Sequence, residues 1–425
     1  MWSPKRVVSV SSRFALGVVL GLCMEAPAQA QSPPPAAPAA AVEVPTLSLS
    51  ECLVIGLERR PDVRAARASS DAASLGNRGL DNLSVIATLA RPDLAVRKKQ
   101  SVQSILVARA GVEKSQHDAI YDVTRTYYTY VYARQQEQSA ATVIADLELF
   151  AKLVDQLLKS PLRDPRSKVT PFALSGVRNL MSEVRLTAFK AELGRRQALV
   201  ALKEAMGGDF DKDFVPRDAR LPSLDGDLTK EQVIGLAMSR RPELVMAAAG
   251  SEAFRLEICA QMKARGMLSP TLGAGRDVHS LRIPMPLRDG EYRPGGILPE
   301  MPSAVVGKRD DRVARAAELS RRADAAAEQV TNLVRLEAEN AFIAWEVSTK
   351  RVAEARKRYD NARKTLDEAR IAALTQMDPD LMMTHATIAG RALADQVETT
   401  FEHLKALATL ERVTGGGLQP AFPGR

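Results

Sequence analysis

Apolar residues recur at steps of three and four along two unusually long segments. Residues 93–160 form a run of 68 interrupted only by Gly111, and residues 308–378 form a run of 71 without Gly or Pro. In the second run the helical spacing is clearest from Val330 to Trp345. At about 1.5 Å per residue, each segment would form a helix of roughly 100 Å. Such lengths are typical of coiled-coil assemblies rather than compact globular domains.

Two stretches of sequence follow the same pattern and share an Arg-Arg-Pro motif. Residues 47–68 read LSLSECLVIGLERRPDVRAARA and residues 228–249 read LTKEQVIGLAMSRRPELVMAAA, a match without gaps at an offset of 181. Ser48 and Thr229 each follow a leucine and suit the N-cap of a helix. The proline after each Arg-Arg pair predicts the end of one helix and the start of the next.

A second match follows further along the chain. Pro171 and Pro379 are each followed by 35 residues and then by a Gly-Gly pair, at an offset of 208. The chain is therefore a tandem duplication whose second copy carries 27 extra residues. The predicted organisation, in order along the chain, is a first helical repeat (46–208), a linker (209–227), a second helical repeat (228–417) with a possible short strand insert (268–307), and a tail (418–425).

The N-terminus has the pattern of a signal peptide over residues 1–30. Basic residues precede an apolar run of 11 residues, and Ala28-Gln29-Ala30 has the form of a cleavage site. Cys23 raises a less favoured alternative, a lipoprotein that begins at that residue. Residues 31–45 form a Pro/Ala-rich leader. We expect an exported protein without a transmembrane helix, because no other stretch approaches 18 unbroken apolar residues.

Composition agrees with long helices. The chain is 45% hydrophobic but only 4% aromatic, so its core must consist mainly of Ala, Leu and Val. The formal net charge of +8 suggests nucleic acid as a partner. The signal peptide and the interspersed acidic residues argue against that reading. Cys52 and Cys259 could pair in an oxidising compartment, although two small buried apolar residues are the favoured interpretation.

Catalytic chemistry has little support. The histidines are His117, His279, His385 and His403, and none has the spacing of a metal-ligand pair. No Gly-rich phosphate loop follows a strand, and the glycines at 415–417 are better interpreted as a helix stop. We therefore expect no enzyme activity and no cofactor.

The signal peptide, the duplicated hairpins and the paired L-[ST]…RRP-[DE] openings together resemble the TolC-like outer-membrane efflux family, over residues 46–417. The segment RIAALTQMDPDLM at 370–382 resembles the family's turn at the periplasmic end, with Leu374 where the family usually has Gly. The resemblance implies a homotrimer whose helices form a coiled-coil α-barrel. It also implies a passive export conduit in the outer membrane, which receives cargo from an inner-membrane pump through a periplasmic adaptor protein.

The sequence departs from this family where the membrane strands should lie. Residues 268–307 have room for two strands but are rich in proline, and the first-repeat counterpart, residues 80–92, is too short for a hairpin. Two strands per protomer would give six in a trimer, below the roughly eight of the smallest membrane barrels. We therefore expect a reduced or absent membrane β-barrel. A periplasmic coiled-coil scaffold that conducts nothing is the alternative function.

The turn at 370–382 supplies the candidate periplasmic entrance, which consists of Arg370, Asp378 and Asp380. If three protomers converge there, each aspartate becomes a ring that favours cations. The alternative is that Asp380 merely caps or begins a helix, where a negative charge suits the helix dipole.

Two other groups of residues have competing interpretations. The basic cluster Arg91, Arg97, Lys98 and Lys99 could meet anionic groups of outer-membrane lipid, or it could be an ordinary solvated helix start with a compensating partner. The segment YDVTRTYYTYVY (121–132) places three tyrosines on one helical face, namely Tyr121, Tyr128 and Tyr132. They could line a tunnel, but packing between neighbouring helices is favoured.

Overall fold

A computed structural model of the protein describes residues 44–159, 169–208, 210–211, 213–223, 226–271, 301–376 and 379–418. These residues all belong to one unit, Val44–Arg425. The predicted signal peptide, nearly all of the leader and nearly all of the tail lie outside the described residues, so these assignments stay predictions.

The helices fall into two runs of the same order. The first run is α1 (Leu49–Arg59), α2 (Pro61–Asp81), α3 (Val85–Ala90), α4 (Leu94–Lys159) and α5 (Pro171–Ala205). The second run is α6 (Lys230–Arg240), α7 (Pro242–Lys263), α8 (Arg309–Gln376) and α9 (Pro379–Val413). Apart from α3, each run has a short helix, a second helix, a very long helix and a 35-residue helix. The prediction of duplicated long helical hairpins is confirmed.

Local chemistry explains why the opening phrase occurs twice. Ser48 caps α1 and Thr229 caps α6, and a capping box is completed three residues later by Glu51 or Gln232. Each box satisfies two backbone N–H groups that the first turn of a helix leaves without partners. A proline occupies the first turn of both α2 and α7, where its missing N–H costs no helical hydrogen bond.

The ends of α5 and α9 require glycine. Gly207 has φ of +108° and Gly415 has φ of +61°, both in the region that other residues rarely adopt. A Cβ atom on Gly207 would lie 2.9 Å from the Cβ of Arg59, and one on Gly415 would lie 3.0 Å from that of Arg240. The Gly-Gly stops therefore let the end of each 35-residue helix pack closely against the joint between α1 and α2 or between α6 and α7.

The described strands are short. β1 (Thr46–Leu47) pairs in parallel with β2 (Val215–Pro216), which ties the start of the first repeat to the predicted linker. β3 (Leu268–Pro270) pairs antiparallel with β4 (Ala304–Val306), with Ser269 opposite Val305. The two ends of the predicted insert 268–307 are thus joined, and residues 272–300 between them lie outside the described part.

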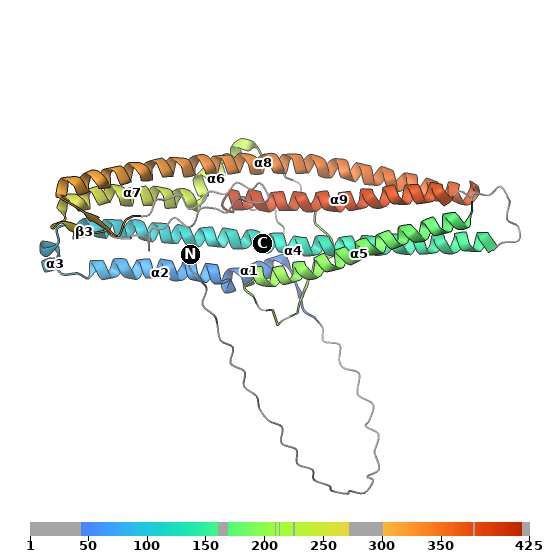
Figure 1. Cartoon of the computed structure of the whole chain (residues 1–425), viewed down its shortest axis with the longest axis horizontal. Helices are drawn as coiled ribbons and strands as arrows, with labels where there is room; N and C mark the ends of the chain where they lie inside the picture. Colours follow the sequence, from blue (N-terminus) through green and yellow to red (C-terminus); the bar gives the residue numbers. More distant parts are fainter. Residues whose placement is uncertain are drawn as a thin grey trace, which may run out of the picture. The chain divides into compact units, whose positions relative to one another are not determined.

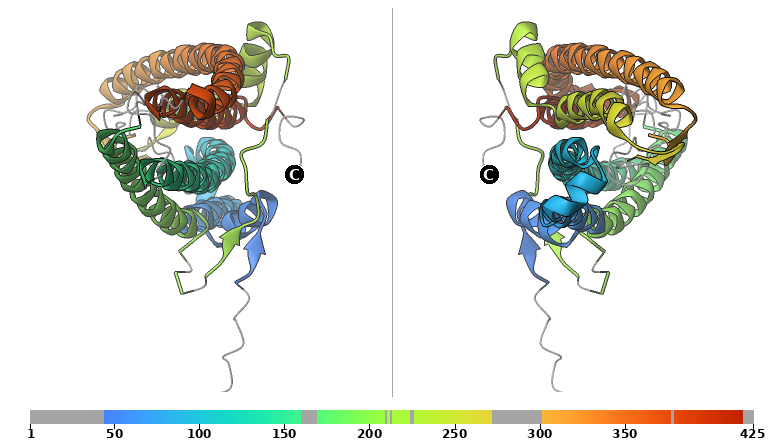
Figure 2. Two further views of the ribbon diagram at one scale, coloured as in Figure 1. Left: turned by 90° about the vertical axis from the view of Figure 1, so that its right-hand side faces the viewer. Right: turned by 90° about the vertical axis from the view of Figure 1, so that its left-hand side faces the viewer.

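The long helices set the arrangement of the others. Figure 1 shows α2 and α5 following one another beside α4, and α7 and α9 following one another beside α8. α4 also packs against α7 and α9, so α5 and α8 lie at the two edges of the layer (Figure 2). None of the described helices is both long and apolar enough to cross a membrane.

The largest core joins both repeats and contains the tyrosine-rich segment of α4. Tyr121 and Tyr128 are buried, and the ring of Tyr132 stacks on Phe401 of α9 with 4.7 Å between ring centroids. The prediction that these tyrosines pack between helices is confirmed. The hydroxyl of buried Tyr127 donates to Asp218 at 3.0 Å, which holds the segment after β2 against α4.

Cys52 and Cys259 are free, so the disulfide between them that the sequence left open is not formed in the structure. Cys52 is fully buried in the core, where burial raises the pKa of its thiol to about 12. Cys259 is exposed on α7. The interpretation of two buried small residues is therefore right for Cys52 and wrong for Cys259.

Candidate functional site

The second arginine of each RRP motif lies where two short helices meet, at the α1–α2 junction or the α6–α7 junction. In both repeats it forms an ion pair with the long helix of the same repeat. In the first repeat, the Arg60 guanidinium lies 2.6 Å from an oxygen of Asp122 on α4 and 2.9 Å from one of Asp62 on α2. Burial opposes the charge of Arg60, yet the hydrogen bond to Asp122 and the nearby carboxylates outweigh burial and raise its pKa. The motif therefore fixes the position of α1 and α2 along α4.

In the second repeat the corresponding contacts are more deeply buried. Arg241 lies 2.8 Å from Glu243 and 2.9 Å from Glu337 on α8, and Arg412 on α9 lies 2.6 Å from Glu337. The side chains of Arg241, Glu337 and Arg412 are 2%, 5% and 6% exposed. Arg412 also approaches Asp118 of α4 at 3.9 Å, which links the two repeats. We call these four residues, Arg241, Glu243, Glu337 and Arg412, the Glu337 node.

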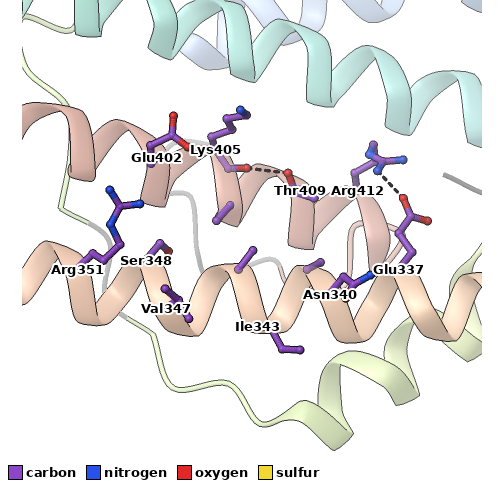
Figure 3. A pocket seen from close by; sticks show the side chains of 13 residues that line it. Glu337, Asn340, Ile343, Val347, Ser348, Arg351, Glu402, Lys405, Thr409 and Arg412 are labelled. Carbon is purple, nitrogen blue, oxygen red and sulfur yellow. Dashed lines mark hydrogen bonds and ion pairs between the residues drawn. The ribbon is translucent and has the colours of Figure 1, made fainter. Parts of the chain in front are cut away.

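A cavity of about 580 Å³ runs between α8 and α9 beside the Glu337 node (Figure 3). Glu337 and Arg412 lie at one end of it, and Arg351 and Glu402 lie toward the other. Ile343 adds an apolar side chain to the α8 wall. The volume lies within the range of small-molecule pockets. Because acidic and basic residues alternate along it, the cavity presents no single sign of charge.

Arg370 of the predicted entrance ties the end of α8 to the other hairpin. Its guanidinium lies 2.7 Å from Asp146 of α4 and 3.4 Å from Asp367 of α8. Asp378 lies outside the described residues, and the structure describes only the backbone of Asp380, in the first turn of α9. The proposed aspartate ring therefore stays a prediction, while the partner of Arg370 is a finding.

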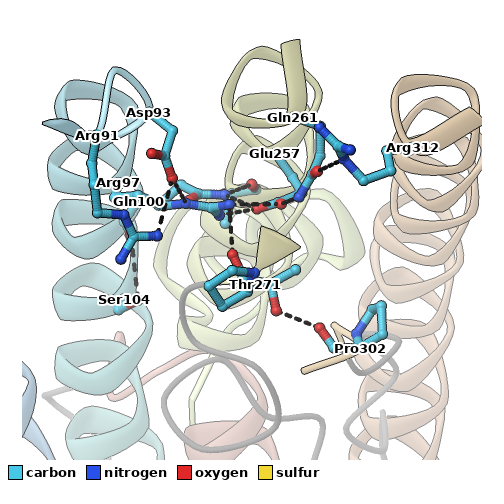
Figure 4. Close-up of polar contacts among 12 residues, drawn as sticks. Arg91, Asp93, Arg97, Gln100, Ser104, Glu257, Gln261, Thr271, Pro302 and Arg312 are labelled. Atoms are coloured by element: carbon cyan, nitrogen blue, oxygen red, sulfur yellow. Dashed lines mark hydrogen bonds and ion pairs between the residues drawn. The ribbon is translucent and has the colours of Figure 1, made fainter. Parts of the chain in front are cut away.

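The predicted basic cluster is divided by the structure. Arg97 is buried, and its guanidinium binds Glu257 of α7, Asp93 and the carbonyl oxygen of Pro270 (Figure 4). Its assignment to a lipid-facing surface is wrong, because a buried charge is held by its ion-pair partners and is withdrawn from solvent. A compensating partner near the start of α4 is found instead, as the alternative interpretation expected.

The other three basic residues of that cluster remain accessible. Arg91 is largely exposed and lies 3.6 Å from Asp93. Lys98 is partly exposed and lies 3.8 Å from Asp81, and Lys99 is exposed. These three side chains keep the lipid-contact hypothesis open at the start of α4, without Arg97.

The pairing of Arg97 with Glu257 extends into a polar network at the base of the β3–β4 insert. Gln261 donates to Glu257 at 2.6 Å and accepts from Arg312 of α8 at 3.0 Å. The same Arg312 guanidinium donates to the carbonyl oxygens of Gly266 and Gly307, at 2.6 and 2.8 Å. The network joins α4, α7 and α8 and fixes both ends of the insert.

Large apolar side chains remain exposed on the two edge helices. They follow helical steps of three, four and seven, so each set lies along one face. The α5 stripe is Leu186, Phe189, Leu193 and Val200, and the α8 stripe is Leu336, Ile343 and Val347. Their side chains are between 41% and 64% exposed. Several large exposed apolar side chains on one helix face are typical of surfaces that bind other proteins.

Metal chemistry finds no support in the described residues, which contain no group of three His, Cys, Asp or Glu side chains able to hold an ion. His117 of α4 is half-buried beside the glycines that end α9. Burial lowers its pKa, although Glu243 and other nearby carboxylates oppose this effect. His117 is therefore harder to protonate in the folded chain than in the unfolded chain.

Sequence reasoning missed the acidic partners Asp122, Glu257 and Glu337. Asp122 lies 62 residues from Arg60, and Glu257 lies 160 residues from Arg97, each on another helix. No local pattern marks an acid that becomes buried by helix packing.

Comparisons with known proteins give the fold. No family model matches the sequence, and no curated protein matches it. The structure matches a membrane protein from Pseudomonas aeruginosa with a TM-score of 0.67 and 15% identity, over 86% of this chain and 92% of that one. It matches the outer-membrane channel OprN with a TM-score of 0.66 and 16% identity, over 88% and 91% of the two chains. It matches the open state of the MtrE outer-membrane channel from Neisseria gonorrhoeae with a TM-score of 0.64 and 15% identity, over 87% and 89%.

The chain has the TolC-like outer-membrane channel fold. The resemblance that the two RRP openings suggested is therefore confirmed at the level of the fold, and the match spans both repeats. OprN and MtrE, two of these matches, are outer-membrane channels, which agrees with the sequence-based expectation of no enzyme activity.

Proposed function

We propose that the protein is the outer-membrane channel component of a tripartite efflux or type I secretion system. It would act as a passive conduit across the periplasm and the outer membrane. The observation that carries this proposal is the TolC-like fold itself, which matches outer-membrane channels over 87% to 88% of this chain. Long helices of about 66 to 68 residues supply the roughly 100 Å that a periplasmic tunnel requires.

The proposed assembly is a homotrimer. The α5 and α8 stripes lie on opposite edges of the helical layer, so the α5 stripe of one copy can cover the α8 stripe of the next. A head-to-tail contact of this kind, between the α5 edge of one copy and the α8 edge of the next, can be repeated around an axis until the copies form a closed ring. The same contact buries the apolar side chains that a single copy leaves in water.

Charge insertion into the α5 stripe tests the trimer. Phe189→Asp should shift the full chain toward monomer in native mass spectrometry, because a buried carboxylate would face the neighbouring apolar stripe. Thr187→Asp is the matched control, since it adds the same charge about 160° away around α5. Equal amounts of trimer in both variants would remove the support for this interface.

The proposed entrance is the end of the hairpins that carries Arg370, Asp378 and Asp380, where a periplasmic adaptor and an inner-membrane pump would engage. The ion pair between Arg370 and Asp146 joins the two hairpins there at 2.7 Å. Breaking it should let the hairpin ends separate more easily. We therefore expect Arg370→Ala to raise conductance in planar lipid bilayers, relative to the wild type.

Arg358→Ala is the control for the entrance, because Arg358 is also on α8 and also paired, with Asp395 on α9 of the same hairpin. Asp378→Asn and Asp380→Asn should lower cation selectivity in the same recordings, because they remove the carboxylate charges of the proposed ring. Conductance that is the same in the Arg370 and Arg358 variants would refute a role for Arg370 in the entrance.

A periplasmic scaffold that conducts nothing is the second candidate. The observation that favours it is α3, because residues 85–90, in the first-repeat counterpart of the insert, form a short helix. Membrane fractionation with a carbonate wash separates the candidates. Retention in the outer membrane, together with conductance in bilayers, supports the channel, whereas release into the soluble fraction supports the scaffold. In the channel reading, Arg91, Lys98 and Lys99 would face lipid head groups.

A further inference from the structure

A cavity of about 640 Å³ lies where α4, α8, α9 and the segment between α5 and α6 meet. That segment crosses the bundle on its way from one repeat to the other (Figure 2). Besides the Tyr127–Asp218 contact, further hydrogen bonds hold it on α4. The backbone N–H of Leu221 donates to Gln135 at 3.2 Å, and Arg134 donates to the carbonyl oxygen of Pro216 at 3.4 Å. The cavity is thus a built feature of the fold with walls from both repeats.

The described charged residues that line this cavity are all basic. Arg220 of the crossing segment and Arg356 and Arg363 of α8 line it, and its described lining contains no aspartate or glutamate. Arg356 and Arg363 are seven residues apart, two helical turns, so they lie on the same side of α8. Within the described part of the chain, none of the three guanidinium groups forms an ion pair.

The opposite groove of the same helix pair is different. The cavity there, also between α8 and α9, is balanced, with three basic and three acidic lining residues, namely Arg351, Lys357, Arg358, Glu354, Asp395 and Glu398. The smaller cavity nearer the hairpin ends is balanced as well, because Arg363 and Arg370 share it with Asp146 and Asp367. An excess of three positive charges is therefore a property of one cavity and not of α8 in general.

The remaining wall supplies neutral hydrogen-bonding groups. Gln138 of α4 and Gln396 of α9 contribute side-chain amides that have no hydrogen bond within the described residues. An amide N–H₂ group can donate to an anion without adding charge. Tyr359 and Val352 add half-buried apolar surface to the wall.

We propose that this cavity is a binding site for a small polyanion that carries phosphate or carboxylate groups. Arginine holds such groups with two parallel hydrogen bonds, and three like charges in a concave wall concentrate anions from solution. The bound anion would bridge the crossing segment, α4 and the α8–α9 hairpin, and so clamp the two repeats together. The site requires no conduction, so it stands or falls separately from the proposed channel function.

Isothermal titration calorimetry of the purified full chain in detergent, with pyrophosphate as the probe at low ionic strength, tests the site. We expect saturable binding of one pyrophosphate per protomer and a higher midpoint of thermal unfolding. Each lost guanidinium should weaken binding about tenfold, so Arg356→Gln with Arg363→Gln should weaken it about a hundredfold. If the double variant does not fold, Arg220→Gln tests the site instead, because Arg220 lies in the exposed crossing segment, and it should weaken binding about tenfold.

Arg351→Gln is the matched control, because Arg351 is an exposed arginine of α8 that also lacks a described ion pair and does not line this cavity. Its affinity for pyrophosphate should equal that of the wild type. Equal weakening in the control and in the cavity variants would overturn the proposal in favour of diffuse charge attraction. Absence of saturable binding would overturn it too. Binding only to phosphatidylglycerol vesicles, and not to free pyrophosphate, would assign the arginines to a lipid surface instead.

Discussion

Replacing Glu337 by Gln tests how strongly the Glu337 node holds the second repeat together. The change removes a buried carboxylate that lies 2.6 Å from Arg412 and 2.9 Å from Arg241. Removing one partner of a buried ion pair typically costs about 3–5 kcal/mol, because the other charge stays buried without compensation. Arg241 keeps Glu243 at 2.8 Å, so we expect the lower end, about 3 kcal/mol.

Thermal unfolding followed by circular dichroism measures this loss. For the roughly 330 described residues the unfolding entropy is about 0.7 kcal/mol/K, so 3 kcal/mol corresponds to a fall in Tm of about 4 °C. Asp122→Asn, the first-repeat counterpart, should cost only about 1 kcal/mol, because the Asp122 side chain is 36% exposed and Arg60 keeps Asp62. Glu354→Gln, on the solvent face of α8, should change nothing measurable.

Adding Arg412→Met to Glu337→Gln should restore part of the stability, because the second change removes the uncompensated charge. The reasoning is refuted if Glu337→Gln lowers Tm no more than Glu354→Gln does. A double variant that is less stable than the sum of its two single variants would also contradict an ion-pair origin of the loss.

Three further outcomes are expected. Gly207→Ala should lower the free energy of unfolding by about 1–3 kcal/mol, because φ is +108° there. Gly111 lies inside α4 with no atom within 4 Å of an added Cβ, so Gly111→Ala should raise the free energy of unfolding by about 1 kcal/mol. Denaturant titrations measure both changes. Burial lowers the pKa of His117 below its usual 6.5, so the unfolded chain takes up this proton first and stability is lost as the pH falls through that value. His117→Gln should flatten that pH dependence in thermal unfolding, and an unchanged slope would contradict it. Maleimide should label exposed Cys259 in the native protein and buried Cys52 only after unfolding, as mass spectrometry would show.

The sequence by itself determined the duplicated long helices and their order. The starts of α1, α2, α6 and α7 follow from capping side chains and prolines, and the Gly-Gly pairs end α5 and α9 through positive φ angles. These signals act within a few residues, so they can be recognised without knowing what packs against them. The 181-residue and 208-residue offsets add the duplication, and with it the TolC-like resemblance, because repeated local signals imply repeated local structure.

Only the tertiary structure decided which side chains meet across helices. Arg97 looked like an exposed charge near a helix start, yet packing of α4 on α7 places it against Glu257, 160 residues away. The Glu337 node and the arginine-lined cavity have the same origin, since each gathers residues from three or four separate elements. Helical periodicity shows that a face exists, but the identity of its partner depends on the register and order in which long helices pack, and no local signal carries that information.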